Sequence, residues 1–240
     1  MSQLGDLTKA FISHTMHYNA SLPISIDVLE KIGYLRYKLK VGHKEMTTKS
    51  MKTLKVGEKY WGNFSESKDG ILAINNLRKK PTLMQKNENF LAIDSFDFLE
   101  YILDNKDPAL SIKKWILKLL AECENKEIFY TLSSMLLALH EGIVHLPLSI
   151  NRNIFLLQWR ENQSLNDSLI DFYFAYENLG AIQGRVDSTT NSLNIQTLFE
   201  RTANFLNRHS KDAPFTLQVE TNDNLNPIWE GTHGLLDIKG

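Results

Sequence analysis

The clearest strand pattern in the chain is Leu169-Ile170-Asp171-Phe172-Tyr173-Phe174-Ala175-Tyr176. It belongs to a region, beginning at Ile143, in which apolar residues alternate at period two, the spacing typical of β-strands. Ile154–Arg160 shows the same alternation before it. After it, Ala181–Asp187 and Ser192–Gln196 flank a polar loop, which predicts a β-hairpin. This part of the chain is therefore predicted to form a sheet of consecutive strands.

A helix and one more strand complete this predicted α/β domain, which we place at residues 142–222. The apolar stripe of the helix, which ends near His209, consists of Leu198, Phe199, Thr202, Ala203 and Leu206. This spacing is helical. Phe215–Val219 then alternates as a closing strand. Residues 223–240 are predicted to be a C-terminal tail.

Residues 96–141 change to helical spacing and are predicted to be a helical connector. A first helix is expected over residues 98–103, after an N-cap region at Ser95 and Asp97. A second helix is expected to begin after Asp107-Pro108, and a third to span Ile128–His140.

The polar breaks between these helices are expected to be open to proteolysis. The two breaks are Asn105-Lys106-Asp107 and Glu124-Asn125-Lys126. If the α/β domain is an independent unit, a fragment of residues 141–222 should resist the protease.

Residues 21–95 contain short strand patterns separated by turn residues. The predicted strands are Leu22–Leu29, Tyr34–Lys40, Tyr60–Phe64, Gly70–Ile74 and Phe90–Ile93. Strands at roughly 8–15-residue spacing are typical of small barrels or sandwiches, and we predict a small β-barrel. Residues 1–20 are predicted to be a helix or a tail. The expected fold class is α+β: a small N-terminal β-barrel, a helical connector, and a C-terminal α/β domain with a hairpin and one amphipathic helix.

Composition narrows the class of protein. The 240 residues are 42% hydrophobic and 23% charged, which supports a packed core and excludes a wholly disordered chain. The single cysteine, Cys123, excludes a disulfide framework and a multi-cysteine zinc site. The sequence shows neither a signal-peptide pattern nor an apolar run long enough to span a membrane. We therefore expect a cytoplasmic protein without membrane insertion.

Recognisable catalytic motifs are missing from the sequence. The histidines of His140-Glu141-Gly142-Ile143-Val144-His145 would lie about 140° apart around a helix, so they do not share a face as zinc-protease ligands do. A helix-to-strand junction is the favoured interpretation of this stretch. The sequence holds no phosphate-binding loop, dinucleotide fingerprint or nucleophile elbow. We expect no enzyme activity, no cofactor and no metal; an enzyme that uses the region of His140 and His145 is the weakest alternative.

Basic residues concentrate in residues 31–81. This segment carries thirteen Lys and Arg against four Asp and Glu, a net of +9, which leaves −10 for the rest of a chain whose total is −1. Basic residues interleave with aromatic ones around Tyr34, Tyr37 and Trp61, as in barrels that stack nucleic-acid bases. A solvated basic face over an aromatic interior is the favoured interpretation. A single-stranded nucleic-acid or anion-binding module that uses the basic barrel is the alternative.

The segment Gly142–Val219 resembles the C-terminal domain of the flagellar hook-length control family, FliK. The family pattern is an alternating strand, a Leu-Gly step, a second strand, a short hairpin with a further strand, and an amphipathic helix. The corresponding residues are Leu169–Tyr176, Leu179-Gly180, Ala181–Asp187, Ser192–Gln196 and Leu198–Arg208. The front block is similar to the small barrel that precedes this domain in some FliK-like proteins, and to the surface-presentation-of-antigens module of the secretion-apparatus C-ring. The turn Leu54-Lys55-Val56-Gly57-Glu58 carries much of that second similarity.

The resemblance implies a non-enzymatic component of flagellar or type III export. Such a component would dock on an export-gate protein, such as the cytoplasmic part of FlhB, or on other export components, and would influence substrate switching or hook length. It would act in the cytoplasm or be exported through the flagellar apparatus.

The candidate partner-binding residues are Leu179, Gly180, Arg185 and Asp187. Gly180 is expected to adopt a positive φ in a turn, because a larger residue would be strained there. Arg185 alternates with Gln183 and Asp187, so its side chain is expected on the solvent face of its strand.

Overall fold

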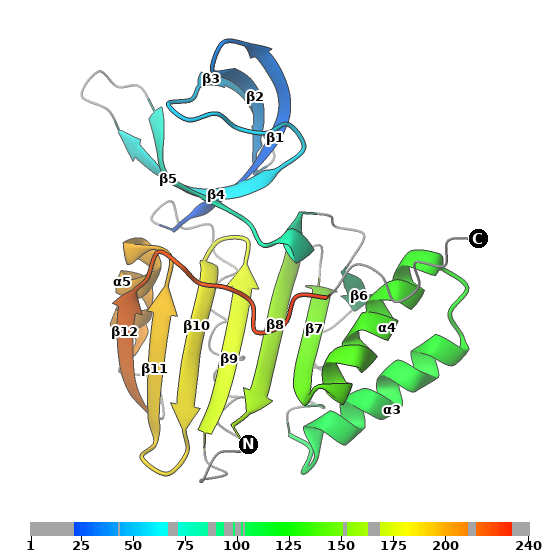
Figure 1. Ribbon diagram of the computed structural model, residues 1–240. Coiled ribbons are helices and arrows are strands. Elements are labelled where there is room, and N and C mark those ends of the chain that lie inside the picture. The colour runs from blue at the N-terminus through cyan, green and yellow to red at the C-terminus, as the bar shows by residue number, and fades with distance from the viewer. Residues whose placement is uncertain are drawn as a thin grey trace.

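The described residues of the computed structural model form two sheets and three α-helices, which confirms the α+β class but not the predicted small barrel (Figure 1). It describes residues 22–42, 44–66, 72–85, 90–93, 98, 102, 104–150, 153–162, 169–210 and 215–231. The predicted N-terminal helix or tail lies outside the described residues, and so does most of the predicted helix at 98–103.

A small five-stranded antiparallel sheet forms the N-terminal part of the molecule. Its strands are β1 Ile24–Gly33, β2 Arg36–Val41, β3 Lys44–Lys49, β4 Lys59–Glu66 and β5 Leu72–Lys79, in the order β3-β2-β1-β4-β5. The sheet is strongly curved in Figure 1. Within the described residues β3 and β5 are its two edges and do not pair with each other, so a closed barrel is not confirmed.

The concave face of this sheet holds a core of its own. Val28, Tyr37 and Leu39 are buried there together with Leu54, which comes from the connection between β3 and β4. The backbone N–H of Leu54 donates to the Tyr37 hydroxyl at 3.2 Å. The connection therefore packs across the concave face instead of looping into solvent.

A mixed seven-stranded sheet forms the second part. Its strands are β6 Leu91–Ile93, β7 Ile143–Ile150, β8 Asn153–Glu161, β9 Leu169–Tyr176, β10 Gly180–Asp187, β11 Ser192–Thr197 and β12 Thr216–Thr221. Strands β7 to β11 are an antiparallel meander, and each outer strand, β6 or β12, is parallel to its neighbour. Parallel neighbours require crossover connections. These contain α3 (Pro108–Ala121) and α4 (Lys126–His140) between β6 and β7, and α5 (Glu200–His209) between β11 and β12.

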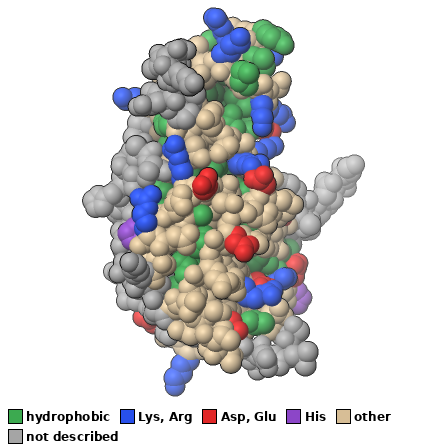
Figure 2. Space-filling model, turned by 90° about the vertical axis from the view of Figure 1, so that its left-hand side faces the viewer, with side chains coloured by type: hydrophobic (Ala, Val, Ile, Leu, Met, Phe, Trp, Pro, Cys, Tyr) green, Lys and Arg blue, Asp and Glu red, His purple; other side chains and the backbone are tan. Residues whose placement is uncertain are grey.

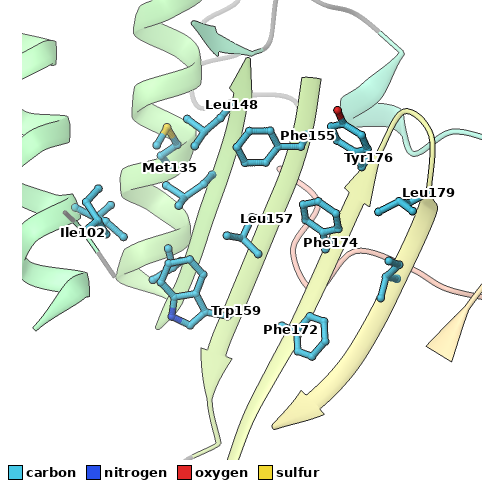
Figure 3. Close-up of a cluster of buried hydrophobic side chains, with 14 of the residues drawn as sticks. Ile102, Met135, Leu148, Phe155, Leu157, Trp159, Phe172, Phe174, Tyr176 and Leu179 are labelled. Atoms are coloured by element: carbon cyan, nitrogen blue, oxygen red, sulfur yellow. The ribbon is translucent and has the colours of Figure 1, made fainter. Parts of the chain in front are cut away.

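Two sequence expectations are corrected by this topology. The strand at Phe90–Ile93 was expected in the first block, but β6 pairs with β7 in the large sheet. The helices were expected to connect two units, but α4 packs on β7, and Met135 of α4 lies in one core with Leu148 and Phe155 (Figure 3). The helical segment is therefore part of the second unit, because its apolar faces are buried against the sheet.

The segment 222–231 crosses the sheet face opposite the helices (Figure 1). Leu225 and Trp229 of this segment are buried. Gln158 of β8 holds it: the Gln158 Oε1 accepts from the backbone N–H of Ile228 at 2.8 Å and of Trp229 at 3.2 Å, and its Nε2 donates to the Trp229 carbonyl at 2.7 Å. The side-chain amide acts as a peptide group would in a sheet, so this part of the predicted tail is a packed strap.

The two sheets contact each other through buried side chains. Trp61 of β4 lies in a cluster with Tyr173 of β9 and with Phe199, which precedes α5. The Arg201 guanidinium of α5 donates to the carbonyl of Phe64 at 2.6 Å. The described parts of the chain are thus joined by an apolar contact reinforced by a charge-assisted hydrogen bond.

Candidate docking groove

Helices α3 and α4 form a hairpin in which a side chain caps the start of each helix. The Asp107 carboxylate accepts from the backbone N–H of Leu110 at 2.9 Å. The Asn125 side chain accepts from the N–H of Glu127 at 2.8 Å and of Ile128 at 3.1 Å. Each cap satisfies N–H groups that have no partner inside the helix. Both helices therefore begin at positions fixed by local sequence, and the short link at residues 122–125 turns the chain back on itself.

Only some of the apolar residues of the hairpin are buried on its inner face. Ile112 and Ile116 of α3, and Leu132 and Met135 of α4, are fully buried. The large apolar side chains left exposed are Leu110, Leu117, Ile128, Phe129 and Tyr130. A helix buries one stripe, so Ile128-Phe129-Tyr130 cannot all face the core. That run of three consecutive apolar residues was visible in the sequence and signals a second apolar face.

A groove of about 630 Å³ lies between the two helices. Its lining residues are Lys113, Leu117, Ser133, Leu136, Leu137, Leu139 and His140. Leu117 is exposed, while Leu136, Leu137 and Leu139 are half-buried. Phe129 lies one turn before Ser133 on α4 and extends the apolar surface beyond the groove. We call the groove-lining residues together with Phe129 the hairpin groove.

The charge along the hairpin groove is positive. Helix α3 carries Lys113, Lys114 and Lys118 and no acidic residue. The Lys126 ammonium at the start of α4 lies 5.7 Å from the centre of the Tyr130 ring. A surface that combines leucines with lysines is suited to a partner that is apolar at its centre and acidic around it.

The predicted partner-binding residues lie at opposite ends of β10. Leu179 is fully buried in the large core, where it does not reach the surface. Gly180 has a φ of +77°, as expected, and a Cβ there would lie 2.7 Å from the Phe199 ring. These two residues shape the β9–β10 turn, and their placement supports a packing role.

Arg185 and Asp187 are at the other end of the strand, where Arg185 is exposed, as expected. The Arg185 Nε donates to Asp171 at 2.6 Å, and this bond raises the pKa of the guanidinium. The Asp187 carboxylate caps the β10–β11 loop by accepting from the backbone N–H groups of Thr189 and Thr190, and the side chain of Thr190 contributes most to its lowered pKa. Both charges already have partners within the chain, so their role in partner binding stays a prediction.

His140 and His145 lie at the expected junction between α4 and β7. His140 is exposed at the end of α4, whereas His145 is buried in β7 against the Trp229 ring. Burial lowers the pKa of His145 to about 3, and its Nδ1 lies 2.9 Å from the Gln158 Nε2. Within the part of the chain that the structure describes, no three His, Cys, Asp or Glu residues gather as metal ligands.

The positive charge of the small sheet is partly neutralised by acidic residues that pair with its lysines. Lys38 pairs with Glu45 at 2.7 Å, and Lys79 pairs with Glu58 at 2.6 Å. Tyr37 and Trp61 are fully buried. Tyr37 lies in the core of the small sheet, as that interpretation expects, whereas Trp61 is buried in the contact between the two sheets. Neither ring is exposed to stack on a base.

Comparison of the chain with protein-family models, with curated proteins and with solved structures finds no match. No helix among the described residues is long and apolar enough to cross a bilayer. The proposal for function therefore rests on the surfaces of this fold, and in particular on the apolar hairpin groove.

Proposed function

We propose that this protein is a non-enzymatic docking component of flagellar or type III export, with a FliK-like C-terminal domain. It binds an acidic amphipathic helix of an export-gate protein, of the FlhB type, in the hairpin groove. Binding there influences which substrates pass the gate.

The observation that carries the docking role is the second apolar face of the α3–α4 hairpin. Phe129 and Tyr130 are 48% and 52% exposed, although α4 already buries a stripe against β7 and α3. Exposed apolar area of this kind, next to a hollow, is typical of interaction surfaces.

Charge and shape together favour a helix as the occupant. Grooves between helices accept the apolar face of an amphipathic helix through anchors spaced three or four residues apart. Lys113 and Lys118 lie on α3 without an acidic residue beside them on that helix. Acidic side chains flanking the apolar anchors of the partner would pair with these lysines and speed association.

The export assignment is supported by the order of elements in the large sheet. The strand, Leu-Gly turn, strand, hairpin and helix that carry the resemblance to the FliK family are present as β9, β10, β11 and α5. The amphipathic helix α5 buries Thr202, Ala203 and Leu206. Its Arg201 contacts the small sheet, and its Arg208 is exposed.

The test is binding to a purified cytoplasmic FlhB-type domain, measured by biolayer interferometry. Leu117→Ser combined with Phe129→Ser removes two exposed anchors, and we expect affinity to fall at least tenfold through faster dissociation. Met51→Ser, which removes an exposed apolar side chain of the small sheet, is the matched control and should bind like the wild type.

Salt dependence separates this proposal from the nucleic-acid alternative. Lys113→Gln with Lys118→Gln should slow association. At 0.5 M salt the affinity for the gate domain should be only on the order of fivefold weaker, because apolar contacts are insensitive to screening. Binding of a single-stranded oligonucleotide that falls by orders of magnitude over that salt range would favour the alternative. Failure of the wild type to bind the gate domain would reject the export assignment.

A further inference from the structure

The small sheet has an end that lies farthest from the large sheet (Figure 1), and exposed apolar side chains gather there. Two segments form this end, residues 31–36 and 49–52, which we call the tip. Figure 2 shows basic and hydrophobic side chains side by side over the small sheet at this end of the molecule. Tyr34 is 86% exposed, Met51 is 93% exposed and Ile32 is 47% exposed.

The two segments of the tip are fixed to each other by hydrogen bonds. The backbone N–H of Ser50 donates to the carbonyl of Leu35 at 2.8 Å. The buried Ser50 hydroxyl donates to the carbonyl of Lys52 at 2.5 Å and accepts from its N–H at 3.1 Å. This turn closes tightly around Ser50 and leaves Met51 outward. The exposure of Met51 and Tyr34 is therefore built into the fold.

The basic residues of the tip have no acidic partner within the described part of the chain. They are Lys31, Arg36, Lys49 and Lys52, and neither segment contains Asp or Glu. Arg36 and Lys49 lie directly opposite each other in the β2–β3 register. Like charges in that position destabilise a sheet. An anionic surface applied to the tip would relieve this repulsion.

We propose that the tip binds the surface of an anionic membrane. Tyr34, Met51 and Ile32 enter the headgroup region, and the four basic side chains around them contact lipid phosphates. Apolar side chains at the tip of a turn with lysines and an arginine around them match the composition of surface-bound protein segments. This is peripheral contact by loops, distinct from a membrane-spanning segment.

The chemistry of the tip favours lipid over the other anionic partners. Tyr34 gives the tip a single exposed ring, whereas Ile32 and Met51 have no ring on which a base could stack, and Tyr37 and Trp61 are buried. Three of the four cations are lysines, which protein–protein interfaces disfavour, whereas tyrosine and lysine are both common at membrane surfaces.

The position of the tip leaves the hairpin groove free. The tip lies at one end of the molecule, and α3 and α4 pack beside the large sheet at the other (Figure 1). A protein bound to a membrane by the tip can therefore hold the groove away from the lipid, toward a partner.

The test is flotation of the full chain with vesicles of phosphatidylcholine alone or with one third phosphatidylglycerol. We expect flotation only with the anionic vesicles. High salt should abolish binding, because it screens the attraction between the basic side chains and the anionic lipid. Lys49→Gln with Lys52→Gln should weaken partitioning roughly twentyfold, since each basic group near an anionic surface strengthens binding about fivefold. Lys106→Gln with Arg208→Gln removes the same charge at two exposed positions outside the tip and should float like the wild type.

Insertion of the apolar side chains is tested separately. Tyr34→Ser with Met51→Ser should reduce flotation at least tenfold and keep the thermal melt of the wild type, because both side chains are exposed. A Met51→Trp variant should show extra fluorescence quenching by brominated lipid beyond that of the native tryptophans. Equal flotation of wild type and tip variants, or no flotation at all, would overturn the proposal. So would tip-dependent binding to an oligonucleotide or an acidic peptide without binding to vesicles.

Discussion

Gly180 shows how one residue in the chain constrains its neighbours. Its φ of +77° lies in the region that only glycine adopts without strain, and the Phe199 ring lies where a side chain would begin. Gly142, which ends α4, has nearly the same φ, +75°, but no atom lies within 4 Å of its missing Cβ. The two positions therefore separate the cost of the backbone conformation from the cost of the contact.

We expect Gly142→Ala to lower the free energy of unfolding by about 1 kcal/mol through backbone strain alone. Gly180→Ala should lower it by about 2–4 kcal/mol, because the Phe199 ring must also move. Urea denaturation of both variants measures the difference. Equal losses in the two variants would show that the Phe199 ring can move aside without lowering the free energy of unfolding.

His145 makes stability depend on pH. Its folded-state pKa of about 3 is below the usual value near 6.5, because burial excludes the charged form. The unfolded chain binds a proton at His145 as the pH falls below about 6.5, while the folded chain stays neutral there. Stability contributed by the neutral form is thus complete above pH 6.5 and is lost as the pH falls toward 3.

From this residue we expect the free energy of unfolding to fall by about 2 kcal/mol between pH 7 and pH 5. Urea denaturation at the two pH values measures it. His145→Phe keeps a ring against Trp229 and should lose most of this pH dependence, although it is less stable at pH 7 because Gln158 loses a partner. An unchanged pH dependence in His145→Phe would contradict this assignment.

At the scale of elements, local signals predicted most of the large sheet. β9 has the predicted bounds, Leu169–Tyr176, and the hairpin of β10 and β11 surrounds the predicted polar loop. β3, with the sequence Lys-Glu-Met-Thr-Thr-Lys, was missed because it carries almost no apolar alternation and is recruited by pairing with β2. Edge strands of this kind are defined by their neighbour's hydrogen bonds more than by their own side chains.

The helical hairpin and the strap change the expectation for proteolysis. A fragment of residues 141–222 would lose Leu132 and Met135 from one face of its sheet and Trp229 from the other. We therefore expect the isolated fragment to lack a cooperative thermal transition. A protein nicked in the link 122–125 should instead elute as one species in gel filtration and separate only in denaturant. A 141–222 fragment that melts cooperatively would show that the sheet is independent.

At the scale of the whole molecule, a buried lysine lies where the two sheets meet. The Lys80 ammonium donates to the Ser25 hydroxyl at 2.6 Å, lies 3.6 Å from a Glu177 carboxylate oxygen, and is 5.6 Å from the centre of the Trp61 ring. Burial lowers the pKa of Lys80, and the negative charges of Glu177 and Asp27 oppose that shift. The charge is tolerated at the junction because groups from both sheets surround it.

Replacing a buried charge by an apolar group of similar volume is often neutral or stabilising. We expect Lys80→Met to leave the free energy of unfolding unchanged or to raise it by about 1–3 kcal/mol. Glu177→Gln, which leaves the buried ammonium with fewer partners, should lower it by about 1–2 kcal/mol because Glu177 is partly exposed. Both are measured by urea denaturation at pH 7. A larger loss in Lys80→Met than in Glu177→Gln would mean that the ammonium is a net stabiliser of the junction.

The sequence alone determined the elements whose signals are local. Alternation at period two defined β8 to β11, Asp107-Pro108 marked the start of α3, and Gly180 required a left-handed turn. The start of α4 was expected at Ile128 and lies two residues earlier, after the Asn125 cap. These features depend on side chains within a few residues of each other, so they can be predicted from the sequence.

Only the tertiary structure decided which of these elements share a core. It moved β6 into the large sheet, packed α4 on β7, and joined Gln158 to Trp229 across the face of the sheet. It also revealed that Leu179 is buried and that Arg185 is paired with Asp171, while Leu117, Phe129, Tyr34 and Met51 are left exposed. Sequence patterns show that a residue is apolar, but its burial depends on the area that distant segments happen to cover, and that is settled only when the chain has folded.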